Sequence, residues 1–299
     1  MSHNHNNNHN HRNLNLKNIR AALIINFTFT IIELIGGFLA NSVAIISNAV
    51  HDLGDTIALS FSFFSEKIAL QKSSDEHYTY GLNRLPLLAA FVNSVILLVG
   101  SIFILYHTVP RLFIPEEPKA YIMVIIGIVG FAANGMALLR LRKNEGLNSK
   151  VLGLHLLEDT LGWAAVIIGA IFIKLFDWKI VDPLLSVLIT VYILFNVFKN
   201  LRSSLRLFMQ KSPETIETNE ILKFINGFED VISVEDFHFW SLEGTQHILS
   251  THIKVKDSIK PEVLYNLKNS IRKGIKKFGD IHSTIEVEYE SENCNDHCD

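Results

Sequence analysis

Two short stretches of this sequence carry a histidine and an aspartate four residues apart, each inside an apolar run. They are HDLGD at residues 51–55 and HLLED at residues 155–159. In a helix, residues four apart lie on the same face, about 6 Å apart along the axis. Each stretch therefore points one imidazole and one carboxylate in a common direction. Two such helices facing each other would supply two His and two Asp, a complete tetrahedral ligand set for a divalent metal such as zinc.

A single pair of this kind inside a membrane also occurs as a polar contact between helices. Ionisable side chains at bilayer depth cost roughly 2.5–3.5 kcal/mol each on insertion scales, so they persist where they pair, line a cavity or carry function. Because the pair occurs twice, we interpret it as an intramembrane metal site. Asn48 and Asp52 are accessory candidates that support the ligands or line the ion path. Asp75, Glu76 and His77 form either an accessory site or a solvated acidic loop.

The composition indicates a membrane protein with a soluble appendage. Hydrophobic residues make up 48% of the 299 residues, charged residues only 19%, and the mean hydropathy is +0.26. A helical span needs about 20 mostly apolar residues. Six runs qualify, at residues 19–39, 43–64, 85–106, 120–141, 151–175 and 181–198. The first run is too long for a signal-peptide core, so we expect it to be a retained span.

The charge distribution predicts the orientation. Lys and Arg gather in the loops on the side that holds both termini, whereas the loops on the other side contain only Arg111, Lys119, Lys174 and Lys179. By the positive-inside rule, both termini should be cytoplasmic. The net charge of −3 gives no indication of nucleic-acid binding.

Both ends of the chain are low in apolar residues and rich in metal-ligand types. Residues 1–18 are rich in His and Asn, so we expect a disordered cytoplasmic tail that is either simply solvated or captures metal loosely. Residues 291–299 contain Cys294, His297 and Cys298. In the cytosol these thiols should be reduced and available to a metal.

A second domain is predicted between the membrane runs and the C-terminal tail, which divides the chain into residues 1–18, 19–211, 212–290 and 291–299. The periodicity of the third segment favours helices at 213–228 and 261–278 and strands at 231–242, 246–255 and 281–289. The order α-β-β-α-β suits a small α+β sandwich with both helices on one face of the sheet.

The two-residue period of a strand separates a polar from an apolar face. It places His252 on the polar face of the second strand, and His282 and Glu286 on the polar face of the third. On the first strand, Asp236 and His238 alternate with Glu235, Phe237 and Phe239. Three histidines therefore fall on one exposed face, which is either an ordinary surface cluster or a second metal site.

With these residues in view, the chain resembles the cation diffusion facilitator family of divalent-metal exporters over nearly its whole length. Residues 42–55 are similar to the family sequence around the transport site, with Asn48 where the family usually has Asp. Residues 78–84, YTYGLNR, are similar to the family pattern Tyr-x-Tyr-Gly-x-x-Arg, with Pro86 at a position that is commonly acidic. The dipeptide Asp182-Pro183 is a further family landmark.

The resemblance implies six transmembrane helices and a ferredoxin-like cytoplasmic domain, in a homodimer of the bacterial inner membrane that exports metal in exchange for protons. It assigns the transport ligands to His51, Asp55, His155 and Asp159, and this pairing is similar to the zinc and cadmium branch. Zn²⁺ would be substrate and regulator, with no organic cofactor.

For the cytoplasmic domain, the resemblance places metal-binding positions at 235, 238, 252 and 282. Glu235 departs from the histidine common there, which puts the usual two-metal site in doubt. The strand period turns Glu235 away from Asp236 and His238, and a β-bulge would reconcile the two assignments. Glu286 completes the candidate set. The tail with Cys294, His297 and Cys298 resembles metal-binding tails of some members.

The expected mechanism is alternating access about a midplane site, with protons and metal competing for the same ligands. One alternative is an intramembrane zinc hydrolase, which needs a Glu beside the metal, as in His-Glu-x-x-His. Neither stretch supplies that arrangement, so we expect no enzymatic activity. Another alternative is a membrane metal sensor, but we find no kinase-like, nucleotide-binding or helix-turn-helix pattern to carry a signal. We therefore expect a secondary transporter that exports Zn²⁺, and also Cd²⁺ and other divalent cations.

Overall fold

The computed structural model describes residues 5–71, 76–141 and 147–292, which fold as two compact units. The first unit comprises residues 1–73 and 89–201, and the second comprises residues 74–88 and 202–299. The first unit is helical, whereas the second contains the sheet. The residues that precede α3 thus belong with the sheet-containing unit.

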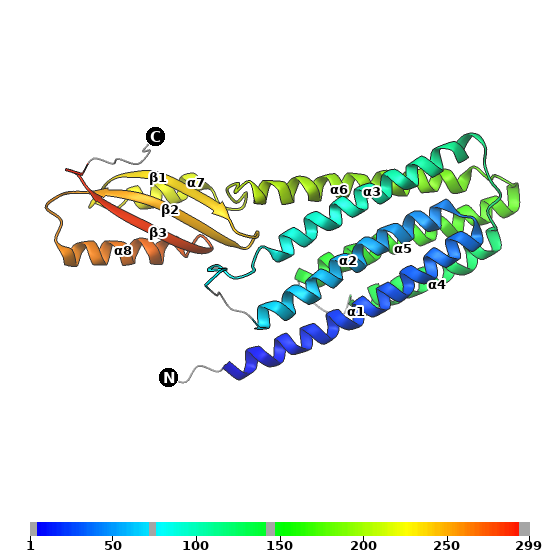
Figure 1. Ribbon diagram of the computed structural model, residues 1–299, viewed down its shortest axis with the longest axis horizontal. Coiled ribbons are helices and arrows are strands. Elements are labelled where there is room, and N and C mark those ends of the chain that lie inside the picture. The colour runs from blue at the N-terminus through cyan, green and yellow to red at the C-terminus, as the bar shows by residue number, and fades with distance from the viewer. Residues whose placement is uncertain (1–4, 72–75, 142–146, 293–299) are drawn as a thin grey trace. The chain divides into compact units, whose positions relative to one another are not determined.

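Six long helices follow one another in the described part of the helical unit. They are α1 (His5–Ala40), α2 (Val43–Gln71), α3 (Leu85–Phe113), α4 (Ala120–Leu141), α5 (Leu147–Phe176) and α6 (Val181–Phe208) (Figure 1). Among the described residues, α1, α3, α4, α5 and α6 are long and apolar enough to cross a membrane. At 29 residues α2 is as long as α3, but His51, Asp52 and Asp55 lower its hydropathy. The structure thus supports a helical membrane domain, and α2, the long helix of the described residues without a sufficiently apolar stretch, carries half of the candidate transport ligands.

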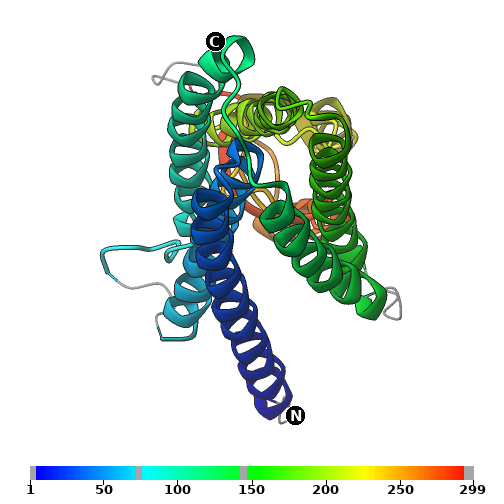
Figure 2. The same ribbon diagram turned by 90° about the vertical axis from the view of Figure 1, so that its right-hand side faces the viewer.

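Three connections of the helical unit meet at the end of the bundle that faces the viewer in Figure 2. Asn41 Nδ2, between α1 and α2, donates to Glu116 Oε2 at 2.9 Å, and the backbone N–H of Lys119 donates to the Ala40 carbonyl at 2.7 Å. Lys179, between α5 and α6, pairs with Glu117. These contacts hold the three connections together at one end of the bundle. The two helices on either side of each connection run in opposite directions.

The helical unit is packed with apolar side chains inside and covered with them outside. Trp163 of α5 and Met123 of α4 are fully buried in a core that also includes Ile45 of α2. At the surface, Phe38 is 72% exposed and Phe195 is 68% exposed. Large exposed apolar side chains of this kind are expected where a protein faces lipid.

The first residues of α1 overlap the predicted N-terminal tail, because α1 begins at His5 and the tail is expected over residues 1–18. Once an apolar span forms a helix, each further residue adds one hydrogen bond without a new nucleation cost, so the helix extends beyond the apolar run.

The second unit contains α7 (Thr218–Asn226), β1 (Val231–Ser241), β2 (Gln246–Val255), α8 (Pro261–Ile275) and β3 (Asp280–Tyr289). This is the expected α-β-β-α-β order. In the sheet order β1-β2-β3, β1 and β2 are antiparallel and β2 and β3 are parallel. A parallel pair needs a crossover connection, and α8 provides it.

Both helices of this unit pack on one face of the sheet. Ile225 of α7 and Ile271 of α8 are fully buried in the same core as Leu249 and Ile253 of β2. At Gly274, an added Cβ would lie 1.9 Å from Phe224 Cζ, so α8 and α7 can approach this closely only with glycine there. The opposite face of the sheet carries polar residues, including His252, as the strand period predicts.

Candidate metal sites

The structure brings together three of the four expected transport ligands. His51 and Asp55 lie one turn apart on α2, with 3.9 Å between His51 Nε2 and Asp55 Oδ2. Asp159 of α5 approaches the same nitrogen, with 3.9 Å between His51 Nε2 and Asp159 Oδ1. The side chains of His51 and Asp55 are 25% and 26% exposed, and that of Asp159 is 11% exposed. One imidazole thus lies between carboxylates from two helices and remains partly accessible.

The fourth expected ligand, His155, belongs to α5, but its side chain lies outside the described residues. Among the side chains that are described, no three or more of His, Cys, Asp and Glu are close enough to hold one ion. Ligands at about 2.05 Å from a tetrahedral zinc are about 3.4 Å from one another. The 3.9 Å separations at His51 therefore have to shorten by roughly half an ångström when an ion binds.

Close packing sets the position of the helix that carries these ligands. A Cβ at Gly54 would lie 2.5 Å from Leu97 Cδ2 of α3. Glycine at this position therefore lets α2 lie against α3 between His51 and Asp55. A larger residue there would push the ligand-bearing turn away from α3.

The accessory candidates Asn48 and Asp52 lie against a residue that the sequence analysis did not single out. Asn48 Nδ2 donates to Glu33 Oε1 of α1 at 3.4 Å, and the Asp52 carboxyl is within hydrogen-bonding reach of the Glu33 carboxyl. Asn48 is 6%, Asp52 5% and Glu33 0% exposed. The signal for Glu33 was present in the sequence, because it is a single carboxylate inside the first apolar run.

In the second unit, a β-bulge places Glu235 on the polar face of the sheet. Glu235 pairs with His252 and His238 pairs with Ser250, so that β1 has one extra residue in this interval. Asp236, at the bulge, has a positive φ of 45°. The strict two-residue alternation predicted for β1, with Glu235 on the face of Phe237, is therefore wrong at this point, because the inserted residue shifts the period by one.

His252 is the centre of the resulting cluster. Its Nδ1 lies 2.6 Å from Glu288 Oε1, and its Nε2 lies 3.5 Å from Asp236 Oδ2 and 3.6 Å from Glu286 Oε2. His238 Nε2 lies 2.9 Å from Asp236 Oδ1. Three carboxylates thus surround one half-buried imidazole. Glu288, the closest, was not among the predicted ligands, although the strand period puts it on the polar face with Glu286.

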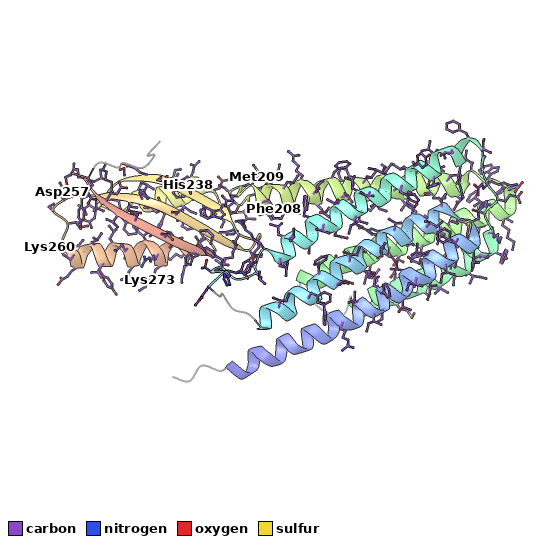
Figure 3. All side chains as sticks on the ribbon, in the orientation of Figure 1. Phe208, Met209, His238, Asp257, Lys260 and Lys273 are labelled. Carbon is purple, nitrogen blue, oxygen red and sulfur yellow. The ribbon has the colours of Figure 1, made fainter. Side chains whose placement is uncertain are left out.

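Two other predicted ligands, Glu235 and His238, lie on this face beside the His252 cluster. Glu235 accepts a hydrogen bond from Ser233 Oγ at 2.7 Å and lies 4.0 Å from Lys254 Nζ. His238 is 65% exposed, at the surface of β1 (Figure 3). Glu235 and His238 therefore border the cluster, and His238 is joined to it through Asp236.

His282 lies apart from the cluster. It pairs with Ile248, whereas Glu286 pairs with His252, which is four residues or about 13 Å along the strands. Its ring instead contacts the Tyr80 ring edge to face, with 5.8 Å between centroids. The same segment is tied down by Arg84, whose Nε donates to the Leu242 carbonyl at 3.2 Å. The YTYGLNR motif thus packs on the sheet near His282.

Within the described residues, the remaining candidate ligands add no further cluster. His77 is exposed on the segment between α2 and α3. Asp75 and the tail residues Cys294, His297 and Cys298 lie outside the described residues.

A helical membrane unit with paired His and Asp side chains, followed by a small α+β domain, is typical of membrane proteins that move metal cations. Comparison with protein families agrees with this class. Residues 19–209 match the cation efflux transmembrane domain, and residues 213–290 match the cytoplasmic domain of cation efflux proteins. The chain therefore belongs to the cation efflux family, the cation diffusion facilitators that its motifs resemble.

Several curated relatives align with most of the chain. The "Cadmium, cobalt and zinc/H(+)-K(+) antiporter" of Bacillus subtilis is 31% identical over 89% of this chain and 86% of its own length. The "Metal cation efflux system protein CzcD" of Cupriavidus metallidurans is 33% identical over 91% and 86%. The "Zinc transporter ZitB" of Yersinia pseudotuberculosis is 32% identical over 92% and 88%.

Proposed function

We propose that the chain is a secondary transporter that exports Zn²⁺, and also Cd²⁺ and other divalent cations, from the cytoplasm in exchange for protons. The observation that carries the proposal is the position of His51 between Asp55 of its own helix and Asp159 of α5. The names of three relatives, which include zinc transport and proton antiport, support the same substrate and the same exchange. His155 would complete a His₂Asp₂ site.

The chemistry of these ligands provides the exchange. A ligating histidine must be neutral and a ligating carboxylate ionised, so metal and protons compete for the same side chains. When the site faces the cytoplasm, at low proton activity, Zn²⁺ displaces the protons. When the site faces outward, protons that enter down their gradient displace Zn²⁺. Alternating access of one site therefore couples the two fluxes without a separate proton site.

The proposal includes six membrane-spanning helices, with α2 as the sixth span, both termini in the cytoplasm, and a homodimer in the bacterial inner membrane. A helix of 29 residues is about 44 Å long, enough to cross a hydrocarbon core of about 30 Å. Polar side chains of α2 contact α1 and α5. This is expected of a membrane-spanning helix, because polar side chains at bilayer depth face neighbouring helices. The cytoplasmic-domain match, in a family of dimeric proteins, supports the homodimer.

We further propose that Zn²⁺ regulates transport through the cluster around His252 in the ferredoxin-like cytoplasmic domain. His252 Nε2 with Asp236 and Glu286 offers one nitrogen and two carboxylates on one side of the ring, which would have to move closer to hold one ion, and Glu288 would orient the ring through Nδ1. An ion there would neutralise part of a strongly negative surface and draw paired domains together. The site would thus act as a sensor of cytosolic zinc and lie outside the ion path.

The alternative of an intramembrane hydrolase has little support in the geometry. Such an enzyme needs a carboxylate beside the metal to activate water. Glu158 is exposed, whereas its neighbour Asp159 faces His51. We therefore propose a transporter without enzymatic activity or organic cofactor.

Reconstitution tests the proposed function. Purified protein in proteoliposomes should accumulate Zn²⁺ when an imposed pH gradient drives protons the opposite way, and the accumulation should stop when a protonophore collapses the gradient. A parallel series with Cd²⁺, Co²⁺ and Mn²⁺, each with and without a K⁺ gradient, determines the substrate range and the exchanged cation. Zn²⁺ uptake that ignores the pH gradient would overturn the proton antiport.

A further inference from the structure

Glu33 is a fully buried carboxylate in the most apolar part of α1. It is 0% exposed, and it lies within Leu23–Ala40, a stretch with a mean hydropathy of 1.9. A carboxyl group in such a place carries a large desolvation cost unless a partner or a function offsets it. The contacts of Glu33 show that its hydrogen bonds do not satisfy both carboxylate oxygens.

Only one of the two carboxylate oxygens is hydrogen bonded. Oε1 accepts a long bond of 3.4 Å from Asn48 Nδ2, whereas Oε2 has no hydrogen-bond partner among the described residues. The Asp52 carboxyl lies within reach of the same group. Glu33 thus contacts α2 through one oxygen and keeps a second, buried oxygen that no described residue satisfies.

A purely structural role does not explain this arrangement. Two other residues of α1 already join α1 to α2. Asn26 Nδ2 donates to Thr56 Oγ1 at 3.0 Å and to the Asp52 carbonyl at 3.2 Å, and Thr30 Oγ1 lies 3.4 Å from Thr56 Oγ1. These neutral groups hold the helices together without burying a charge. A glutamine at position 33 would make the Asn48 contact equally well, at a lower desolvation cost.

The position of Glu33 along the helices is close to the transport site but displaced from it. Its two contacts on α2, Asn48 and Asp52, are centred about three residues before the centre of His51 and Asp55. With a rise of 1.5 Å per residue, this is about 4.5 Å toward the turn between α1 and α2. In the orientation proposed above, that turn faces away from the cytoplasm.

We propose that Glu33 is a further ligand of the transported cation, which the ion reaches when it leaves the His51, Asp55 and Asp159 side chains toward the release side. Glu33 Oε2, the Asp52 carboxyl and the Asn48 amide oxygen form this second position, whose oxygen-rich ligands suit a divalent cation in transit. A step of about 4.5 Å lets new ligands form while the old ones break, so the ion is never without anionic ligands. The proposal rests on the proposed transport function.

Kinetics of a charge-removing variant provide the first test. Zn²⁺ uptake into proteoliposomes should be compared for wild type, Glu33→Gln and Glu33→Asp, each assayed as an assembled dimer. Because the ion meets Glu33 after it has bound, Glu33→Gln should lower kcat about tenfold or more while KM changes less than about threefold. Glu33→Asp, which keeps the anion, should regain part of kcat.

A thiol at the same position separates a ligand from a structural residue. If Glu33 contacts the ion, Glu33→Cys should raise the Cd²⁺:Zn²⁺ rate ratio about fivefold or more, because thiolate favours the softer ion. Thr30→Cys is the matched control. It adds a thiol one turn away on the same buried side of α1, next to Thr56, and should leave the ratio at the wild-type value.

The outcomes are distinct. Wild-type kcat in Glu33→Gln, or an equal loss of both metals in Glu33→Cys, overturns the proposal and leaves Glu33 as a structural residue. If Glu33→Gln does not assemble, the Cd²⁺:Zn²⁺ ratio of Glu33→Cys decides. If neither variant assembles, Glu33→Asp decides: a kcat below that of wild type at unchanged melting temperature supports the proposal, and a wild-type kcat overturns it. Failure of the wild-type protein to transport any divalent cation would instead overturn the proposed function.

Discussion

The carboxylate of Asp182, at the start of α6, caps the first turn of α2 by accepting the backbone N–H of Val43 at 2.9 Å. It also accepts the N–H of Ala44 at 3.3 Å and the hydroxyl of Ser42 at 2.5 Å. The cap comes from another helix and is only 2% exposed. A negative charge at a helix N-terminus satisfies free N–H groups and interacts favourably with the helix dipole. Asp182 therefore anchors the helix that carries His51 and Asp55 about two and three turns further on.

Asp182→Ala should destabilise the protein and disturb transport together. The substitution leaves two backbone N–H groups of α2 without acceptors in a buried place, which should cost about 2 kcal/mol or more. Thermal unfolding in detergent would show the loss, with Asp182→Asn intermediate because it keeps acceptor oxygens. Glu117→Ala, at the same end of the bundle but exposed, is the control and should shift the melting temperature little. Equal melting temperatures for Asp182→Ala and Glu117→Ala would show that the cap adds nothing.

Asp55→Ala and Asp159→Ala should each abolish Zn²⁺ transport while the dimer still assembles. Each substitution removes an anionic ligand from a desolvated cation, and water does not replace the charge fully. Uptake into proteoliposomes at matched protein amounts measures the effect. Glu158→Ala is the matched control, because it removes an exposed carboxylate next to Asp159 and should retain transport. Wild-type rates in both aspartate variants would refute the four-ligand site.

Replacing His51 by Asp should change which metals are transported. The substitution exchanges an imidazole for a harder oxygen ligand, which should relax discrimination toward Mn²⁺ and toward the larger Cd²⁺. Rates for Zn²⁺, Cd²⁺ and Mn²⁺ in the same vesicle preparation give the relevant ratios. If those ratios stay at the wild-type values, metal selectivity resides elsewhere in the protein.

Regular patterns in the sequence predicted regular parts of the structure. The strand expected at residues 246–255 is β2, with the same bounds, because alternate apolar residues there bury one face and leave His252 on the other. Each of the six apolar runs lies within one long helix, but several runs end before the helix does. The apolar run expected at 85–106 continues as α3 to Phe113, since hydropathy marks the apolar core and gives no signal for where a helix stops.

Features that depend on a local irregularity or on two distant residues were not predictable in the same way. The bulge at Asp236 inserts one residue and moves Glu235 to the other face, and nothing in a two-residue period indicates where it falls. Glu33 contacts Asn48 only because α1 and α2 pack together. Its charge within an apolar run did indicate a functional residue, but not its partner. His282 could not be separated from His252 before the register of β2 and β3 was known.

His247 should make the stability of the cytoplasmic domain depend on pH. Burial lowers the pKa of this imidazole below its usual value, although Glu243 and Asp280 nearby oppose the shift. On acidification, the unfolded chain therefore binds the proton first. The contribution of neutral His247 to stability is complete above about pH 6.5 and is lost as the pH falls from there through the folded-state pKa. Urea unfolding of residues 212–290 between pH 8 and pH 5, with chelator present, should show a smaller loss in His247→Gln than in wild type. The same pH dependence in both proteins would exclude His247 as the cause.

The last prediction concerns the two histidines that the strand register separates. Expressed as residues 212–290, the cytoplasmic domain should dimerise and be stabilised by Zn²⁺ through His252 and its carboxylates. Binding to the folded state adds about 2.7 kcal/mol at a hundredfold excess over Kd, which is a rise of roughly 10 °C or more in the melting temperature of a domain this size. His252→Ala should remove most of this rise, and Glu288→Gln part of it, because Glu288 accepts from His252 Nδ1.

His282→Ala is the matched control, because His282 lies four residues further along the sheet and should leave most of the zinc stabilisation intact. In the full chain, His252→Ala should alter the dependence of transport on cytosolic zinc but retain residual transport, as expected of a regulatory site outside the ion path. The triple substitution of His238, His252 and His282 by Ala should do the same. A well-assembled triple variant with no transport at all would place the domain on the ion path, and equal losses in His252→Ala and His282→Ala would show that the register separates no function.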